Sequence, residues 1–377
     1  MLSGEYKIEN LLGNIIYLRS TVIQLKTSDK MLENWYLENL VCPQDKTELR
    51  YSNNCLVSKS GHHYPIINGI PIMLLDNVKQ TIELAHHSLK SFNNNEDEDP
   101  YFINTLGISD QEKERLRQHI GSKKELKDFV VDPIVQFLIA ATNGILYKDS
   151  IGTLTHYPIP NLRLPKVDGE QKQLLDIGCS WGRWCISGSQ KKYICIGIDP
   201  SLGAVLAGQR IAQKLGLNIK FVVGDARYLP FKESIFDQVF CYSVIQHFSK
   251  NDAKQTLTEI NRVLKVNGQS LIQMPNRWGI RSLQHQIKRG FKEGESFDVR
   301  YWGIKELNDC FTKEIGESQI DIDGFFGLGI QKSDLNLLHQ KYRIVVRISE
   351  TLRSLSQVIP SLKYIADSVY IKSIKQS

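Results

Sequence analysis

The spacing of hydrophobic positions changes along the chain, and after residue 170 two patterns alternate. Short apolar runs bounded by turn residues predict strands, at Gln173–Ile177, Tyr193–Ile198, Ile219–Val223, Phe236–Tyr242 and Gln269–Met274. Longer amphipathic stretches predict helices, notably Leu202–Leu215 and Ala253–Leu264, with Asn267-Gly268 as the stop signal of the second. Strands and helices that alternate in this way are typical of an α/β fold with a doubly wound, mainly parallel sheet.

The part of the chain before residue 101 has a different pattern. Residues 1–40 give weak signals and are interpreted as an N-terminal extension. Residues 41–80 contain short extended stretches around an Asn-Gly pair flanked by prolines, which predicts a small β-rich module. Residues 81–100 are interpreted as a linker, because they end in asparagines and four successive acids that favour solvation. The remainder, 101–377, is expected to be one domain, with its core at 170–276 and insertions and the last strands at 277–377.

Composition and charge narrow the function classes. The chain has 377 residues, with 41% hydrophobic and 23% charged residues, which is typical of a globular protein. A net charge of +6 is too modest for a dedicated nucleic-acid binder. The seven cysteines form no C-x-x-C pair, which favours reduced thiols over a disulfide framework. No apolar run reaches the roughly 20 residues of a membrane span, and no signal peptide is evident. We therefore expect a cytoplasmic protein.

Acids and glycines follow the predicted strands where each strand ends. Asp176 and Gly178 end the first strand, and Asp199 ends the second, 23 positions after Asp176. In an open α/β sheet, ligands bind beyond the carboxyl ends of the strands. A carboxylate at the second strand end can accept hydrogen bonds from both hydroxyls of a ribose, and Asp225 with the Ala226 amide can meet an adenine. These strand ends together suit one adenosine-containing ligand.

Five segments, LLDIGCSWGRW, GIDPS, GDARYLPF, FDQVFCYSVIQHF and RVLKVNGQSLIQMPN, occur in this order. As a set they resemble the class I S-adenosylmethionine-dependent methyltransferases over Leu174–Asn276, with Ser180 at a position where that family usually has glycine. The resemblance implies a Rossmann-like sheet of seven strands, ending in antiparallel strands at Ser318–Phe326 and Asp367–Lys375. A dehydrogenase is the competing interpretation, but the G-x-G-x-x-G loop that seats a pyrophosphate is absent from the sequence.

The resemblance also implies S-adenosylmethionine as the cofactor and a set of residues around it. In this sequence the implied cofactor-binding residues are Asp176, Gly178, Cys179, Gly182, Asp199, Pro200, Asp225, Ala226 and Tyr242. Asp176 and Gly178 would hold the methionine end of the cofactor. Asp199 would take the ribose hydroxyls, and Asp225 with Ala226 the adenine.

Candidates for acceptor chemistry lie after the fourth and fifth strands. His247 is the first candidate for a general base, which is needed only if the acceptor must lose a proton; the alternative is a histidine that braces its loop. His285 is a second candidate. Asp298–Trp302 would either line the acceptor pocket or pack in the core. Lys288–Lys292 is interpreted as a solvated turn.

The N-terminal module carries a resemblance of its own. Cys42-Pro43-x-Asp45 and the segment Gly61–Pro71 are similar to zinc-ribbon-like modules that activate tRNA and translation-factor methyltransferases. Structural zinc needs about four nitrogen or sulfur ligands. Asp45 and Ser58 stand where cysteines would be expected, so we expect a module without zinc and no metal elsewhere.

The sequence as a whole predicts an enzyme that transfers a methyl group from S-adenosylmethionine to a small-molecule or glycan-type acceptor, at oxygen. An RNA-modifying methyltransferase is the alternative that the N-terminal module and the positive charge support. A cofactor-binding scaffold without catalysis is a third hypothesis, from a different functional class. The pattern of residues identifies neither the acceptor nor the oligomeric state.

Overall fold

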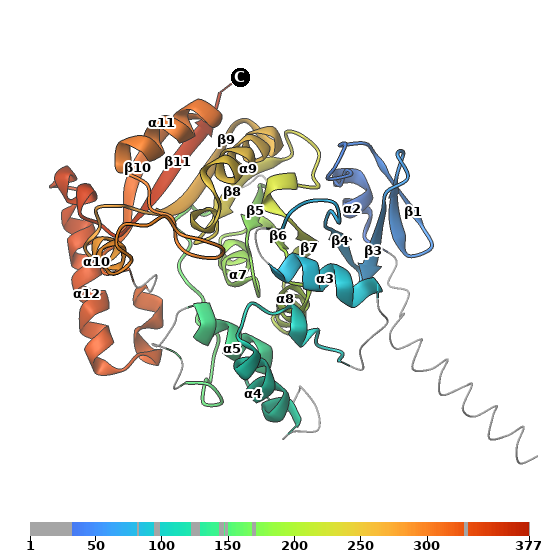
Figure 1. Ribbon diagram of the computed structural model, residues 1–377, viewed down its shortest axis with the longest axis horizontal. Coiled ribbons are helices and arrows are strands. Elements are labelled where there is room, and N and C mark those ends of the chain that lie inside the picture. Colours follow the sequence, from blue (N-terminus) through green and yellow to red (C-terminus); the bar gives the residue numbers. More distant parts are fainter. Residues whose placement is uncertain are drawn as a thin grey trace, which may run out of the picture.

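The computed structural model describes residues 32–80, 83–93, 99–121, 129–142, 147, 150–167, 171–327 and 331–376. Its centre is an eleven-stranded sheet with the strand order β1-β2-β3-β4-β7-β6-β5-β8-β9-β11-β10. Helices cover both faces of this sheet (Figure 1). The expected α/β class is therefore confirmed, but the sheet is mixed and has eleven strands where seven were expected, because the strands β1 to β4 join its edge through β7.

The parallel strands lie at the centre of the sheet and include all five strands predicted after residue 170. They are β5 (Gln173–Ile177), β6 (Ile194–Asp199), β7 (Lys220–Gly224), β8 (Phe236–Cys241) and β9 (Leu264–Pro275). β5 pairs in parallel with β6 on one side and with β8 on the other. Successive residues of a strand point to opposite faces, so Leu174 packs into one hydrophobic cluster and Leu175 into the other.

The two hydrophobic clusters separate the helices into two layers. Buried residues of α5 (Pro133–Thr142), α7 (Arg183–Gln190) and α8 (Leu202–Lys214) join the first cluster. Those of α9 (Lys250–Val263) and α11 (Ile304–Glu314) join the second. A parallel sheet that is covered on both faces keeps nearly continuous apolar strands buried.

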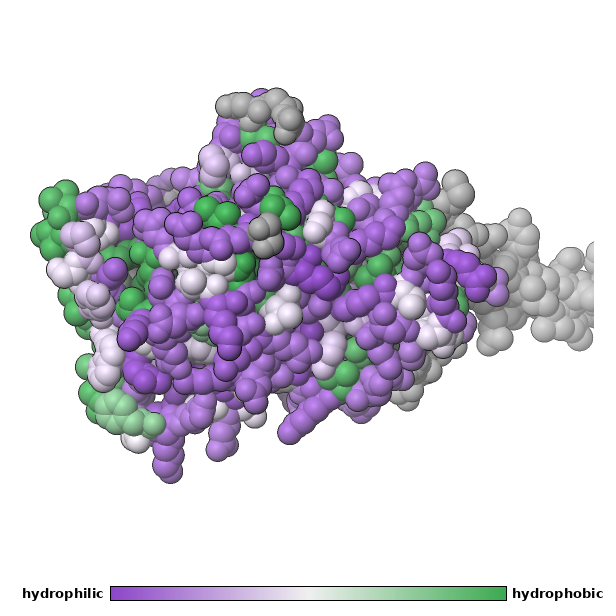
Figure 2. Space-filling model, turned by 90° about the horizontal axis from the view of Figure 1, so that it is seen from above, coloured by the Kyte–Doolittle hydropathy of each residue, from purple (hydrophilic) through white to green (hydrophobic). Residues whose placement is uncertain are grey.

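Two antiparallel strands complete the sheet, as the resemblance implied. β11 (Ser368–Lys375) lies between β9 and β10 (Gly316–Gly324) and is antiparallel to both. Beyond them, α10 (Ile280–Lys288) and α12 (Gln340–Leu355) form one end of the molecule. Hydrophobic side chains gather on the surface at this end (Figure 2), among them Ile344, Leu355 and Val358.

The predicted stop signal of the second helix is wrong. α9 ends at Val263, and Leu264 already pairs with Phe236 of β8. The register then shifts, because β8 advances from Phe236 to Gln238 while β9 advances from Leu264 to Gln269. Asn267 has a φ of 63° in this irregularity. A left-handed Asn followed by Gly therefore forms a bulge inside a strand here, which is the second common use of this pair.

The β-rich segment near the N-terminus extends the main sheet. Its strands are β1 (Leu49–Ser52), β2 (Cys55–Ser58), β3 (His63–Ile67) and β4 (Ile70–Met73). β4 pairs in parallel with β7, through Ile72 with Val223 and Met73 with Gly224. Tyr36, from α2 (Asn34–Asn39), covers the rest of that edge, because its hydroxyl donates to the Phe221 carbonyl at 3.0 Å and accepts from the Phe221 amide at 3.2 Å.

Residues before the core of the domain also pack against the amino end of α8. α3 (Glu83–Asn93) lies within the predicted linker, and its Ser88 hydroxyl donates to the Pro200 carbonyl at 2.7 Å. Thr105, from the 3-10 helix η1 (Ile103–Thr105), accepts from the Gly203 amide at 2.7 Å. Residues 94–98 of the predicted linker, and residues 1–31 of the predicted extension, lie outside the described residues. α4 (Asp110–Gly121) follows, as part of the helical segment before the core.

Gly203→Ala is expected to destabilise the protein, because a Cβ atom at this position would lie 2.7 Å from the Phe102 carbonyl oxygen and 2.9 Å from that of Tyr101. Both neighbours are backbone atoms and give way only if η1 moves away from α8. We expect a loss of about 1–3 kcal/mol of unfolding free energy, measured in urea. Gly121→Ala in α4 is the control, since no atom lies within 4 Å of its Cβ position. Equal stability of the two variants would contradict the packing described for η1.

Candidate cofactor and acceptor site

A cavity opens at the carboxyl edge of the parallel strands. Four predicted cofactor residues line it, namely Gly178, Pro200, Asp225 and Ala226. The remaining lining residues are Gln80, Ala85, Ile177, Ile198, Gly224, Val244 and Phe248. Gln80 and Ala85 come from the segment before the core, so the sequence motifs alone do not complete this cavity.

The loop after β5 has an unusual backbone. Gly178, Ser180 and Gly182 have φ values of 72°, 48° and 79°. A Cβ atom on Gly178 would lie 2.1 Å from Cγ2 of Val244, so a side chain at this position would collide with the loop after β8. Ser180, the departure from the family pattern, adopts the left-handed conformation itself, and its amide donates to Asp199 at 2.9 Å. The departure therefore leaves the path of the loop intact.

Asp199 lies at the end of β6 and is held by two backbone amides. Its Oδ2 accepts from Ser180 and its Oδ1 from Ser201, each at 2.9 Å. Burial raises the pKa of Asp199 to about 6, and these two hydrogen bonds oppose the rise. Each carboxylate oxygen has a further lone pair. The side chain is thus oriented and still able to accept hydrogen bonds from a diol.

Asp176 lies deeper, at the end of β5, and is less well satisfied. Its Oδ2 accepts a hydrogen bond from the Cys185 thiol at 3.3 Å. Its Oδ1 is buried and has no partner within the described part of the chain. Burial raises the pKa of Asp176 to about 7, against the hydrogen bond from Cys185 and the positive charge of Arg183. A buried acceptor without a donor fits the ammonium group of an amino acid, such as the methionine end of the expected cofactor.

Asp225 accepts hydrogen bonds from Arg227, two residues further along the chain. Arg227 donates from its backbone amide to Oδ1 at 2.8 Å and from its guanidinium to Oδ2 at 2.7 Å. Arg227 also pairs with Asp252. The carboxylate of Asp225 therefore caps the 3-10 helix η3 (Ala226–Tyr228), and the predicted adenine contact would use the remaining lone pairs.

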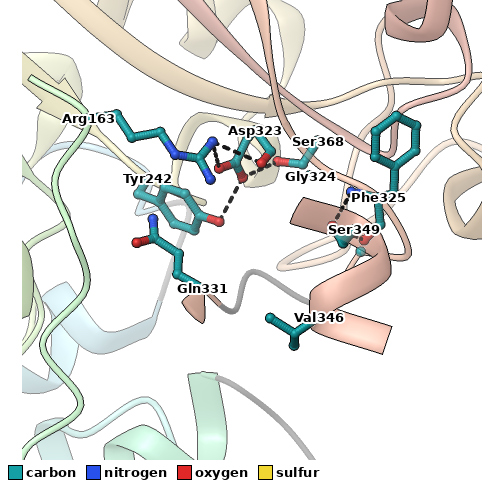
Figure 3. A pocket seen from close by; sticks show the side chains of 10 residues that line it. Arg163, Tyr242, Asp323, Gly324, Phe325, Gln331, Val346, Ser349 and Ser368 are labelled. Carbon is teal, nitrogen blue, oxygen red and sulfur yellow. Dashed lines mark hydrogen bonds and ion pairs between the residues drawn. The ribbon is translucent and has the colours of Figure 1, made fainter. Parts of the chain in front are cut away.

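Of the other predicted cofactor residues, Cys179 and Gly182 lie in the loop after β5 and line neither cavity, whereas Tyr242 lines a second cavity. Figure 3 shows Arg163, Tyr242 and Ser368 converging on the carboxylate of Asp323. Tyr242 and Ser368 donate to its Oδ2 at 2.9 and 2.7 Å, and Arg163 pairs with its Oδ1 at 3.0 Å.

Sequence reasoning did not identify most residues of this second cavity. Arg163, Asp323, Gln331 and Ser368 come from a loop before β5, from β10, from the segment before η5 (Lys332–Leu337) and from β11. They share no spacing, and only the folded chain brings them together. The Nε2 atom of Gln331 is buried without a hydrogen-bond partner among the described residues.

His247 lies in the 3-10 helix η4 (Ile245–His247) and lines neither cavity. Its Nδ1 donates to the Phe297 carbonyl at 2.7 Å, its Nε2 lies 3.2 Å from Nε2 of Gln246, and its ring stacks on that of Phe297 at 3.9 Å. Burial lowers the pKa of His247, so the ring is neutral at pH 7. Its role as a base stays a prediction, and these contacts favour a bracing role.

The other candidates after the fifth strand also lie outside the cavities. Nδ1 of His285 lies 3.3 Å from the Tyr301 hydroxyl. Arg300 donates to the His247 carbonyl, and Trp302 is buried in the second hydrophobic cluster. The interpretation of Asp298–Trp302 as packing residues is therefore favoured over an acceptor-lining role.

In the N-terminal segment, the residues at the expected zinc-ligand positions form hydrogen bonds with other side chains. The Cys42 thiol lies 3.1 Å from the Tyr64 hydroxyl, and Asp45 accepts from Thr47 and Ser60. Within the ranges that the structure describes, no group of three or more His, Cys, Asp or Glu side chains could hold a metal ion. Within the same ranges, no helix combines the length and hydropathy needed to cross a bilayer.

Asp199→Ala is expected to weaken binding of S-adenosylmethionine by about 1–3 kcal/mol, because the ribose hydroxyls lose their acceptor. Isothermal titration calorimetry measures this directly. Asp237→Ala is the matched control, because Asp237 accepts from the Gln173 amide at the opposite end of the strands. An unchanged dissociation constant for Asp199→Ala would show that the ribose lies elsewhere.

Cofactor binding is also expected to depend on pH. The free protein holds Asp176 and Asp199 with pKa values raised to about 7 and about 6. An ammonium group and two hydroxyls favour the ionised carboxylates, so binding lowers both pKa values and releases protons. Affinity should therefore fall as the pH drops below about 7 and level off above it. Calorimetry in buffers with different ionisation enthalpies would detect the protons, and constant affinity from about pH 5.5 to about pH 8 would contradict the assignment.

Comparisons with known proteins agree with this geometry. Residues 174–268 match the family described as a methyltransferase domain. The uncharacterized methyltransferase YcgJ of Bacillus subtilis is 34% identical over 103 residues, which cover 27% of this chain and 40% of YcgJ. Its crystal structure superimposes with a TM-score of 0.36 at 19% identity, covering 55% of this chain and 93% of that one.

Two further relatives cover different shares of their own length. Norajmaline N-methyltransferase of Rauvolfia serpentina is 38% identical over 95 residues, which are 24% of this chain and 32% of that enzyme. The uncharacterized protein MJ1252 of Methanocaldococcus jannaschii is 30% identical over 186 residues, which are 43% of this chain and 67% of that protein. The chain thus spans less than half the length of YcgJ and of norajmaline N-methyltransferase. By its domain, the order of its motifs and its sheet, the chain belongs to the class I S-adenosylmethionine-dependent methyltransferases, whose cofactor is S-adenosylmethionine.

Proposed function

We propose that this chain transfers a methyl group from S-adenosylmethionine to a hydroxyl of a small-molecule or glycan-type acceptor. The observation that carries this proposal is the second cavity, a polar pocket with Tyr242 in its wall at the end of β8. The cofactor cavity begins next to it, since Val244 lines that cavity two residues further along the chain. A pocket set among helices and the last strands, with polar side chains that converge on it, suits a small acceptor group better than a nucleic-acid duplex.

The cofactor, when bound, supplies the methyl group together with its own leaving group. The task of the chain is then to hold the acceptor oxygen close to the methyl carbon and in line with the bond that breaks. Asp176, Asp199 and the loop around Gly178 would fix the cofactor. Tyr242 and Gln331 would orient the acceptor from the other side, because both side chains line the second cavity.

Proton removal from a hydroxyl acceptor has a route through Tyr242. Its hydroxyl already donates to Oδ2 of Asp323, so its own oxygen is free to accept from the acceptor. As the new C–O bond forms, the acceptor proton would pass to the Tyr242 oxygen, and the Tyr242 proton would pass to Asp323. The Arg163 guanidinium, 3.0 Å from the other carboxylate oxygen, would hold the Asp323 side chain in position.

His247 is the second candidate for the base. Its Nε2 is unprotonated, because Nδ1 donates to the Phe297 carbonyl, but it faces Gln246. A role in proton transfer would require Nε2 to leave this partner. Replacement by asparagine, which keeps one donor and one acceptor, would separate a bracing role from a chemical one.

Two other functions have specific support and specific tests. An RNA acceptor is supported by the N-terminal strands and the net charge of +6, and RNA affinity that falls steeply with salt would favour it. A cofactor-binding scaffold without catalysis would bind S-adenosylmethionine and transfer no methyl group to any fraction. The polar, tyrosine-lined pocket favours the small-molecule enzyme over both.

A screen with labelled S-adenosylmethionine over nucleotide-sugar, lipid and RNA fractions is expected to label a small hydroxyl compound. Tyr242→Phe and Asp323→Asn should each lower kcat by about 10²–10⁴-fold, because the proton route is interrupted. Binding of the cofactor, measured by calorimetry, should change little. The control is Lys332→Ala, an exposed position next to Gln331. Full activity of Tyr242→Phe would refute the route, and labelling confined to RNA would refute the proposed acceptor class.

A further inference from the structure

Arg183 is a buried cation, and no described carboxylate forms an ion pair with it. It is the first residue of α7, directly after the left-handed Gly182, and its exposed fraction is 9%. Its Nε atom is buried and has no hydrogen-bond partner among the described residues. Its guanidinium lies over the ring of Trp184, 5.1 Å from the ring centroid. By contrast, Arg227, which is similarly buried, pairs with Asp225 and Asp252.

An unpaired buried charge is costly, because the protein replaces the water around it with few polar groups. A guanidinium offers five N–H donors and is never neutral in practice, so it cannot relieve this cost by losing a proton. Such a group persists where an anion completes the site. No described carboxylate forms an ion pair with Arg183, and its Nε still lacks an acceptor among the described residues, so a bound anion would complete the site.

Arg183 lies near the carboxyl ends of β5 and β8. Its guanidinium lies over the Trp184 ring, and this ring contacts the rings of Phe240 and Tyr242 at 4.8 and 5.0 Å. The positive charge of Arg183 also opposes the burial that raises the pKa of Asp176, at the end of β5. Two more orphaned atoms lie in this neighbourhood, Oδ1 of Asp176 and the hydroxyl of Tyr370.

We propose that Arg183 binds the carboxylate of the amino-acid end of S-adenosylmethionine, with Asp176 holding the ammonium group of the same end. Orphaned groups of opposite character, a carboxylate oxygen and a guanidinium, match a zwitterion. The order of the strands agrees: Asp225 on β7 is assigned to adenine, Asp199 on β6 to ribose, and Asp176 on β5 to methionine. Arg183 follows the β5 loop directly, and its guanidinium lies over Trp184, whose ring contacts Tyr242 at the end of β8. The inference rests on the cofactor site described above.

The test compares two ligands that differ in this end alone. S-Adenosylhomocysteine carries the amino-acid end, and 5′-methylthioadenosine lacks it. Arg183→Met should weaken binding of S-adenosylhomocysteine about 10- to 100-fold, because a charge-assisted hydrogen bond is lost. Binding of 5′-methylthioadenosine should stay within about twofold of the unmutated protein. Arg183→Lys should give an intermediate loss, since it keeps the charge without the two parallel donors.

Thermal unfolding of the ligand-free protein distinguishes this role from a structural one. Removal of an unpaired buried charge should leave the Tm of free Arg183→Met unchanged or higher, while the rise in Tm on adding S-adenosylhomocysteine shrinks. Arg50→Met on the exposed edge strand β1 is the control and should match the unmutated protein in all measurements.

Equal loss for both ligands, or unchanged affinity for S-adenosylhomocysteine, would overturn the assignment of Arg183. In both cases the cofactor site itself would stand, because the unmutated protein binds. If the unmutated protein bound neither compound, the cofactor assignment would fail, and the role of Arg183 would fail with it.

Discussion

The close contact between Gly178 and Val244 is the constraint on which the site depends. With no Cβ on Gly178, the loop after β5 can lie against the loop after β8. The amides of Gly178 and Cys179 both donate to the Ile198 carbonyl, which ties this loop to the end of β6. Three strand ends are thereby held at one point, and the side chains of Asp176 and Asp199 are directed into one region.

Charged side chains near this point differ in whether they have a partner of opposite charge. In the second cavity the charges are paired, since Arg163 lies between Asp323 and Glu350. At the end of β5 and the start of α7 they are not, because Asp176 and Arg183 each have a buried atom without a hydrogen-bond partner among the described residues. Paired groups hold a shape in the absence of ligand, whereas unpaired groups are stabilised when a ligand of the opposite charge arrives. This difference is consistent with a preformed acceptor pocket next to a cofactor site that is completed by binding.

The N-terminal segment contributes to the same edge from outside the family's core. β4 continues the sheet beyond β7, and α3 follows it across the amino end of α8. Gln80 and Ala85 thereby become lining residues of the cofactor cavity. The resemblance of this segment to zinc-ribbon-like activators remains a prediction, while its place in the sheet is a structural fact. Its strands and the edge of β7 pack into the same hydrophobic cluster, through residues such as Leu56, Tyr64 and Val222.

The sequence by itself determined the α/β alternation, the strands of the core and the acids and glycines at their ends, because apolar periodicity and turn chemistry are local properties. It assigned the wrong role to Asn267-Gly268, since this pair serves equally as a helix stop and as a strand bulge, and pairing with β8 decides between them. Only the tertiary structure assembled Arg163, Asp323, Gln331 and Ser368 around Tyr242. Likewise, the sequence marks Arg183 as a charge in an apolar helix start, but whether a charge finds a partner depends on residues far away along the chain.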